Sequence, residues 1–306
     1  MAFTAQDVKK LREMTNVGMM DCKKALQATD GDMGKAVDWL REKGLAKAAK
    51  KADRVAAEGV AFATVVDGVG VVIEVNSETD FAAKTDAFLD LVKNLAEIVA
   101  KQNPADVEAL KACTYPGSSL TVTEIMQEKV MSIGENMQIR RFARFPENTS
   151  VAYVHAGGTH GVLVNLAVEG NIDATEIGKN VAMQIAALNP RFWDKSDVTE
   201  DVLAEEKKVA LALMDQDPKM ASKPQQVKEK IVLGKLNKFY EENCLLQQEY
   251  VKDGSMTVEK YIASAAKELG GSVKFVKAVR FLKGEGIEKK QEDFAAEVAA
   301  QMNAGH

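Results

Sequence analysis

The stretch Val69-Gly70-Val71-Val72-Ile73-Glu74-Val75-Asn76-Ser77-Glu78-Thr79-Asp80-Phe81-Ala82-Ala83-Lys84 contains the change of pattern around which the rest of the chain is organised. Its first half, residues 69–75, is an apolar run of the length of a buried strand. An amphipathic helix is predicted to begin near Lys84. Residues 76–84 therefore form a loop at the end of a strand, a place where functional residues are often found.

This loop supports two interpretations. It presents the carboxylate of Asp80 beside the large ring of Phe81, with small residues around them. Such a pair suits insertion into a partner protein, because an aromatic anchor in a pocket contributes much of the affinity of an interface. Alternatively, Thr79 or Asp80 caps the following helix and Phe81 folds inward against it. Such local signals more often have the second, purely structural meaning.

Length and composition limit the class of protein. The 306 residues are too many for one ordinary domain and fit two or three. A net charge of −5 argues against a protein coated for nucleic acid. Cys22, Cys113 and Cys244 are far apart, which is typical of a reducing compartment and not of a disulfide framework or a zinc site. With no signal segment and no apolar run of spanning length, we expect a soluble, cytoplasmic protein.

Residues 1–45 predict a small domain of three short helices. Apolar residues recur at helical spacing, and the third helix is expected to begin after Asp32 and to end at Gly44. Met19 and Met20 begin the second helix, and Lys23 follows one turn later. The two methionines are either core filler, the more frequent case, or an adaptable contact surface.

Residues 46–58 form a charged, alanine-rich stretch that predicts a linker helix between domains. Its lysines and arginine could also suggest a nucleic-acid patch. That alternative is weaker, because the stretch has no aromatic residue on which bases could stack.

From Gly59 the period changes to that of strands. Residues 60–66 and 69–75 flank Asp67-Gly68, a signal for a type I′ hairpin. Two helices follow, one that begins near Lys84 and is ended by Pro104 and one at 123–134. Residues 137–145 predict a returning strand. Its arginines, Arg140, Arg141 and Arg144, could also suggest nucleic acid, but on an antiparallel strand they are expected to line the solvent face.

The pattern then repeats. A second hairpin (151–155 and 162–168) precedes a helix at 177–188, and much later a helix at 258–269 leads into a strand at 273–282. The closing segments 133–145 and 269–281 share a helix end, a glycine, a strand and a final Arg-Phe pair. We therefore predict an α+β fold with two related halves, each an antiparallel sheet with helices, rather than a doubly wound sheet.

An insertion and a tail complete the organisation. Residues 198–243 predict a helical hairpin whose apolar stripe pairs internally or with a partner; the stripe comprises Val202, Val209, Leu213, Val227, Ile231 and Leu236. The tail predicts a C-terminal amphipathic helix carrying Phe294, Val298 and Met302.

These elements suggest four parts of the chain. They are 1–54 (helical domain and linker helix), 55–146 (first half of the core), 147–283 (second half, with the insertion at about 198–243) and 284–306 (C-terminal module).

The usual motifs of catalysis and cofactor binding are missing together. The sequence has no Gly-x-Gly-x-x-Gly opening a helix, no phosphate-binding Gly-Lys-Ser/Thr and no Gly-x-Ser-x-Gly. His155 and His160 are five residues apart across a glycine turn, which is a weak metal signal. We expect no catalytic, cofactor or metal site, and therefore a protein that is not an enzyme.

Three collinear motifs resemble the bacterial translation elongation factor Ts family over nearly the whole chain. They are residues 11–26 (LREMTNVGMMDCKKAL), residues 74–81 (EVNSETDF) and residues 286–299, in which GIEK is followed by DFAAEVA. Ala82 departs from the family, which usually has valine there, and Ala156 and His160 depart from the pattern around His155.

The resemblance implies a guanine nucleotide exchange factor for elongation factor Tu, in its GDP-bound and nucleotide-free forms. It implies a ubiquitin-associated-like (UBA-like) three-helix domain, a two-part core, a hairpin through which a homodimer could form, and a C-terminal helix. No cofactor, metal, membrane or direct nucleic-acid contact is expected.

The resemblance also implies roles for individual residues. Met19, Met20 and Lys23, together with the C-terminal helix, would grip the GTPase domain of the partner. The loop Thr79, Asp80, Phe81 and Ala82 would wedge the Phe81 ring between two partner helices near the Mg²⁺ site. His155 would fill a second pocket nearby, the metal would be displaced, and GDP would leave.

Overall fold

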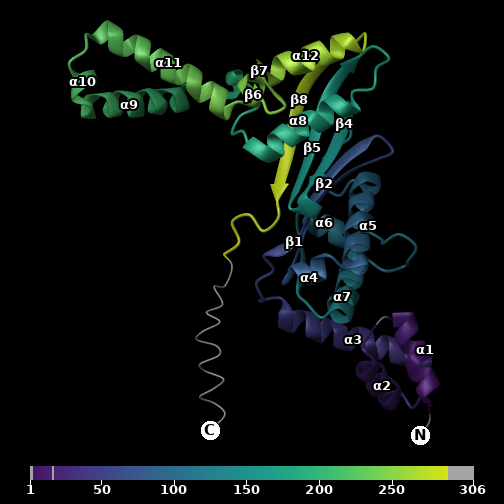
Figure 1. Cartoon of the computed structure of the whole chain (residues 1–306). Helices are drawn as coiled ribbons and strands as arrows, with labels where there is room; N and C mark the ends of the chain where they lie inside the picture. Colours follow the sequence, from purple (N-terminus) through teal and green to yellow (C-terminus); the bar gives the residue numbers. More distant parts are fainter. Residues whose placement is uncertain (1–2, 16, 289–306) are drawn as a thin grey trace, which may run out of the picture.

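Two three-stranded antiparallel sheets form the centre of the computed structural model, which describes residues 3–15 and 17–288 (Figure 1). The first has the order β1 (Glu58–Val66), β2 (Val69–Ser77), β3 (Met137–Phe145). The second has the order β4 (Thr149–His155), β5 (His160–Glu169), β8 (Ser272–Leu282). A two-stranded ribbon, β6 (Glu249–Tyr250) and β7 (Asp253–Thr257), lies beside the second sheet. The predicted α+β class is confirmed.

The two sheets have the same construction. In each, a hairpin is completed by a later strand that pairs with the second hairpin strand. In each that later strand carries a bulge, at Arg140 in β3 and at Val276 in β8. The predicted type I′ turn is present, because Asp67 and Gly68 both have positive φ, 50° and 80°. The repeat seen in the sequence therefore corresponds to two related halves.

Both faces of the first sheet are buried, because helices cover one face and the second sheet covers the other. Val71, Ile73 and Val75 point toward α5 (Asp86–Gln102), α6 (Val107–Ala112) and α7 (Val122–Ile133). The opposite face of the sheet packs on the second sheet through Ala61, Ala63, Val72, Phe145, Leu163 and Phe281. The second sheet is in turn covered by α8 (Thr175–Leu188) and α12 (Val258–Glu268).

Three N-terminal helices form a domain of their own: α1 (Ala5–Thr15), α2 (Met19–Ala28) and α3 (Met33–Lys51). The prediction that the third helix ends at Gly44 is wrong, and so is the separate linker helix. The helix α3 runs on to Lys51 because it packs against α7, where the position of Gly44 lies directly over Met131. Tertiary contact thus outweighs the low helix propensity of one glycine.

The predicted hairpin projects from the second half of the core as α9 (Glu200–Gln216), α10 (Pro218–Ala221) and α11 (Gln225–Asn243) (Figure 1). Its buried seam is made by Ala210, Met214, Val232 and Leu236. The predicted stripe is wrong in part, because Val209, Leu213 and Val227 are exposed. The seam lies one residue further along α9, where small Ala210 lets the two helices approach.

Within the described residues, no helix has the length and hydropathy needed to cross a bilayer. The predicted C-terminal helix, with Phe294, Val298 and Met302, lies outside the described residues. We retain the four-part division of the chain as a proposal.

Candidate partner-binding site

Phe81 lies on a helix of four residues, α4 (Asp80–Ala83), directly after β2. The hydroxyl of Thr79 accepts a hydrogen bond from the Ala82 N–H at 3.2 Å and so caps this helix. Ala82 and Ala83 are buried, while Phe81 is 81% exposed, the largest value among the exposed large hydrophobic residues of the described chain. The predicted cap is therefore confirmed, but the alternative in which Phe81 folds inward is wrong.

The loop before α4 is anchored to the turn between α7 and β3. The Glu135 carboxylate accepts hydrogen bonds from the Thr79 N–H at 2.9 Å and from its hydroxyl at 2.6 Å. The Glu78 carboxylate accepts the Asn136 N–H at 2.6 Å. These bonds tie the loop to a second part of the chain, so the position of Phe81 is set by the fold and not by the loop alone.

A carboxylate accompanies the exposed ring. The Lys84 ammonium donates to the Asp80 carboxylate at 2.5 Å, and this hydrogen bond holds the pKa of Asp80 below its usual value. Asp80 is therefore anionic at neutral pH. The short helix offers a partner an apolar ring and a negative charge side by side.

His155 ends β4 at the same end of the two sheets. The turn between β4 and β5 contacts β1, whose first residue Glu58 pairs with Ser77 immediately before the loop. The His155 side chain is exposed, its Nδ1 lies 2.8 Å from the Tyr153 hydroxyl, and its ring stacks on His160 with 5.9 Å between centroids. The fold thus brings Phe81 and His155 to one end of the core.

Met19, Met20 and Lys23 lie on α2, in the N-terminal helices and apart from α4 (Figure 1). Met19 is 50% and Met20 63% exposed, and Lys23 is exposed as well. The two methionines are therefore not core filler. They form a separate exposed surface that the structure does not join to the Phe81 loop.

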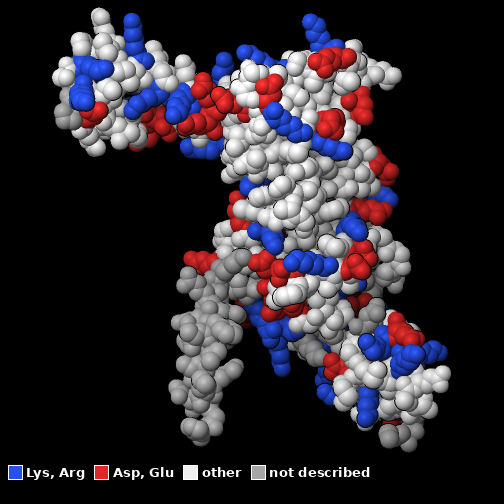
Figure 2. Space-filling view, viewed as in Figure 1, with Lys and Arg blue, Asp and Glu red and all other residues white. Residues whose placement is uncertain are grey.

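Positive side chains gather near the end of α3, where Figure 2 shows a blue cluster. At the end of α3, Lys51 donates to the Gly134 carbonyl, and Arg54, three residues further on, pairs with Glu78 at 3.4 Å. Elsewhere on this face the two signs of charge are mixed. The cluster thus helps to hold α3 against the core.

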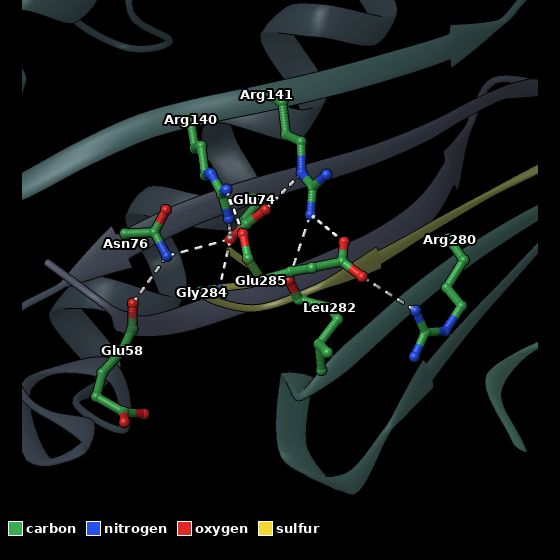
Figure 3. Close-up of polar contacts among 9 residues, drawn as sticks. All are labelled: Glu58, Glu74, Asn76, Arg140, Arg141, Arg280, Leu282, Gly284 and Glu285. Atoms are coloured by element: carbon green, nitrogen blue, oxygen red, sulfur yellow. Dashed lines mark hydrogen bonds and ion pairs between the residues drawn. The ribbon is translucent and has the colours of Figure 1, made fainter. Parts of the chain in front are cut away.

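The role of a buried carboxylate, Glu74, was not predicted from the sequence. Glu74 is fully buried in β2 and accepts hydrogen bonds from Arg140 at 2.9 Å and from Arg141 at 2.6 Å (Figure 3). Arg144 donates to the Ala100 carbonyl. The prediction that these arginines line a solvent face is wrong. The signal was the lone glutamate within an apolar strand, because a buried carboxylate requires a cationic or hydrogen-bonding partner.

Metal binding has no support in the described part of the chain, where no three His, Cys, Asp or Glu side chains come together as ligands would. The pair His155 and His160 lacks a third such residue there. The exposed groups at this end of the core are the rings of Phe81 and His155, with the Asp80 carboxylate partly exposed beside Phe81.

Known proteins resemble this chain over almost its full length. The family model for "Elongation factor TS" matches residues 78–285. The elongation factor Ts of Trichlorobacter lovleyi is 48% identical over 310 aligned residues, covering 98% of each protein. That of Magnetococcus marinus is 47% identical over 302 residues, again covering 98% of each, and that of Syntrophotalea carbinolica is 44% identical. The chain therefore belongs to the elongation factor Ts family of translation elongation factors.

Proposed function

We propose that this protein is a guanine nucleotide exchange factor for elongation factor Tu and acts in the cytoplasm. It would bind the GDP-bound and the nucleotide-free forms of that GTPase. The observation that carries the proposal is Phe81, an aromatic ring 81% exposed on a short helix whose cap and flanking loop are hydrogen-bonded to the core.

In this proposal the Phe81 ring enters between two helices of the partner near its Mg²⁺ site. The neighbouring Asp80 carboxylate introduces a charge of the same sign as the phosphates of GDP, which weakens their binding. His155, at the same end of the core, fills a second pocket. Mg²⁺ and the phosphate-binding loop of the partner are displaced, and GDP leaves.

Nucleotide exchange of this kind requires no bond to be made or broken by this chain. If the factor binds nucleotide-free partner more tightly than GDP-bound partner, reciprocity demands that it weaken GDP binding by the same ratio. Each ~1.4 kcal/mol of this coupling changes the affinity tenfold. An aromatic anchor and the contact area around it can supply several times this coupling free energy. A protein working in this way needs no catalytic base, metal or nucleotide site of its own, and we propose that it is not an enzyme.

A rigid loop suits this role. An aromatic side chain already held in its bound position loses less conformational entropy on binding than one on a mobile loop. The two hydrogen bonds from Thr79 to Glu135 and the Glu78–Asn136 bond supply that pre-organisation.

The N-terminal helices offer a second contact with the same partner. Met19 and Met20 are exposed on α2 beside Lys23. Methionine side chains adapt to irregular apolar surfaces, and the lysine adds a charged rim. We propose that this surface contributes affinity, while the Phe81 loop changes the nucleotide site.

The projecting hairpin is the proposed interface of a homodimer. Val209, Leu213, Val227 and Leu233 remain exposed on α9 and α11, although the seam between these helices is closed. Sedimentation velocity should give the mass of a dimer. A monomer at concentrations above those in cells would exclude the hairpin as a dimer interface.

The test of the function is release of fluorescent GDP from elongation factor Tu under excess unlabelled nucleotide, followed by stopped flow. We expect release to accelerate with the concentration of this protein, and Phe81→Ala to suppress the acceleration. Leu269→Ala is the matched control, since Leu269 is 51% exposed but lies beside β8's first residues, at the opposite end of the sheets. Release at the spontaneous rate with the unmodified protein would refute the proposal.

A further inference from the structure

The carboxylate of Glu74 is the centre of a buried polar cluster between the two sheets (Figure 3). Four nitrogen donors point at it: Nη1 of Arg140 at 2.9 Å, Nε of Arg141 at 2.6 Å, Nδ2 of Asn76 at 3.2 Å and the backbone N of Gly284 at 2.7 Å. Burying a carboxylate is unfavourable unless such partners are present, and these four donors offset that cost for Glu74.

The turn after β8 is built to reach this carboxylate. Gly284 has φ +68°, and a Cβ at this position would lie 2.1 Å from the Ala57 carbonyl oxygen, so only glycine fits. The next residue, Glu285, has partners for both its backbone carbonyl and its carboxylate. Its carbonyl accepts from Arg140, and its carboxylate pairs with Arg141 at 3.2 Å and with Arg280 at 3.7 Å.

The cluster leads directly to the Phe81 loop. The Asn76 amide donates both to Glu74 and to the Glu58 carbonyl at 3.0 Å, and β2 ends at the next residue. Lys283 binds the Glu58 carboxylate at 2.6 Å and donates its N–H to the Thr159 carbonyl in the β4–β5 turn. Hydrogen bonds therefore join the end of β2, the start of β1, the turn that follows His155 and the turn after β8.

Glu74 is ionised in the folded protein, which keeps its hydrogen bonds to these donors in place at neutral pH. Burial raises the pKa of Glu74, but the Gly284 N–H and the two guanidinium groups outweigh this effect, so its pKa lies below the usual value. Glu74 is ionised at neutral pH, when all four of its donors are engaged.

We propose that Glu74 is a positioning residue for nucleotide exchange. It holds the end of β2, and with it Phe81, in a fixed relation to the β4–β5 turn that carries His155. This inference rests on the proposed function, since it assigns Glu74 a role only through the Phe81 loop.

A merely structural role makes a different prediction. If Glu74 only stabilises the fold, Glu74→Gln lowers stability throughout the core and acts independently of Phe81. If Glu74 positions Phe81, its loss matters for exchange only while the ring is present. Glutamine is nearly isosteric and keeps one acceptor oxygen, so the substitution removes the charge and leaves the shape.

The first experiment measures hydrogen exchange of the isolated protein by mass spectrometry. In Glu74→Gln we expect the amides of residues 77–84 to exchange about tenfold faster or more, while those of α5 keep their protection. Glu97→Gln is the matched control, because Glu97 forms an exposed pair with Lys101 on α5. Unchanged exchange in residues 77–84 would overturn the proposal whatever the activity.

The second experiment is a double-mutant cycle on GDP release from elongation factor Tu at saturating concentration. We expect Glu74→Gln to lower the maximal rate about tenfold in the parent and less than about twofold in Phe81→Ala, because groups that act as a unit are not additive. Equal factors in both backgrounds would mean that Glu74 does not act through Phe81.

Failure of the proposed exchange function can be distinguished from failure of the proposed role of Glu74. If the unmodified protein does not accelerate release, the proposed function fails, and the hydrogen-exchange result still decides whether Glu74 holds the loop. If Glu74→Gln does not fold, Glu285→Gln replaces it, because that carboxylate is 44% exposed and binds Arg141 and Arg280. Glu285→Gln should cause a smaller effect with the same dependence on Phe81, and the absence of any effect would overturn the proposal.

Discussion

At the scale of single residues, the exposed ring of Phe81 contrasts with that of Phe88, seven residues later. Phe88 is 0% exposed, in the core between the first sheet and its helices, whereas Phe81 is 81% exposed. The difference follows from their neighbours. Ala82 and Ala83 fill the inner face of α4, so the ring of Phe81 has no room beneath the helix, while Phe88 lies on the inner face of α5.

This contrast gives a prediction about stability. Phe81→Ala should change the free energy of unfolding by less than about 0.5 kcal/mol, since it removes almost no buried area. Phe88→Ala should lower it by about 3–5 kcal/mol, because it leaves a cavity in the core. Urea denaturation followed by circular dichroism measures both. A large loss for Phe81→Ala would show that the ring is part of the folded core.

His160 makes the stability depend on pH. Burial lowers the pKa of His160, and the positive charge of Arg280 and the neighbouring His155 lower it further, while Glu285 opposes them. The folded protein therefore favours the neutral ring, and the unfolded chain binds the proton more readily. The contribution of the neutral His160 ring to the free energy of unfolding is fully present above about pH 6.5, the usual histidine pKa. It is lost as the pH falls toward the lower pKa of the folded state.

The urea concentration at the midpoint of unfolding should accordingly decrease when the pH is lowered from 7.5 to 5.5. The variant His160→Gln should show a smaller fall, because it removes the group whose protonation differs between the two states. The same dependence in variant and parent would assign the effect to other groups.

The residues of the candidate site could be predicted from the sequence only in part. Thr79, Asp80, Phe81 and Ala82 form a local motif, so the loop and its cap were predictable. The cluster around Glu74 was not, because it depends on the register in which Glu74 faces Arg141 and on a turn some 200 residues later, at Gly284. Only the unexplained acid in an apolar strand pointed to it.

At the scale of elements, periodicity predicted the strands and helices well, and packing decided where they end. The strand β3 was predicted at its observed bounds, Met137–Phe145. The helix α3 was predicted too short, because its contact with α7 could not be seen in its own sequence. In the hairpin, the period was right but the inner face was displaced by one residue on α9.

The packing of α11 on α9 is predicted to depend on Leu236, which lies in the buried seam. Leu236→Ala should weaken the packing of α11 on α9, because Leu236 is 7% exposed, and the protection of the α11 amides should fall at least about tenfold. Leu213→Ala, at a position 54% exposed, should leave that protection unchanged in the monomer. Hydrogen exchange by mass spectrometry distinguishes the two. Equal effects would mean that the seam is misassigned.

At the scale of the whole molecule, the close packing of two sheets sets the relation between the Phe81 loop and His155. Gly161 faces the backbone of Ala61, and a Cβ there would lie 2.9 Å from it. Small residues at this contact let the sheets approach without intervening side chains. Sequence repeats predicted the two halves but not their face-to-face contact, since small residues carry no periodic signal for it.

Gly161→Ala should therefore separate the sheets and lower the free energy of unfolding by about 1–3 kcal/mol, as overpacking does. Gly234→Ala is the control, because the corresponding position on α11 has nothing within 4 Å; it should raise stability by about 0.5–1 kcal/mol. Urea denaturation measures both. A neutral Gly161→Ala would contradict the close contact of the sheets.

We propose that Phe81 changes the nucleotide site of the partner rather than merely adding affinity. The most direct test is the maximal rate of fluorescent GDP release from elongation factor Tu at saturating concentrations of the parent and of Phe81→Ala. We predict that the maximal rate falls at least about tenfold, while the concentration giving half of it changes less than about threefold, because an interaction made only in the transition state affects the rate and not the binding. An unchanged maximal rate with a higher half-saturating concentration would show that Phe81 contributes only affinity and does not change the nucleotide site.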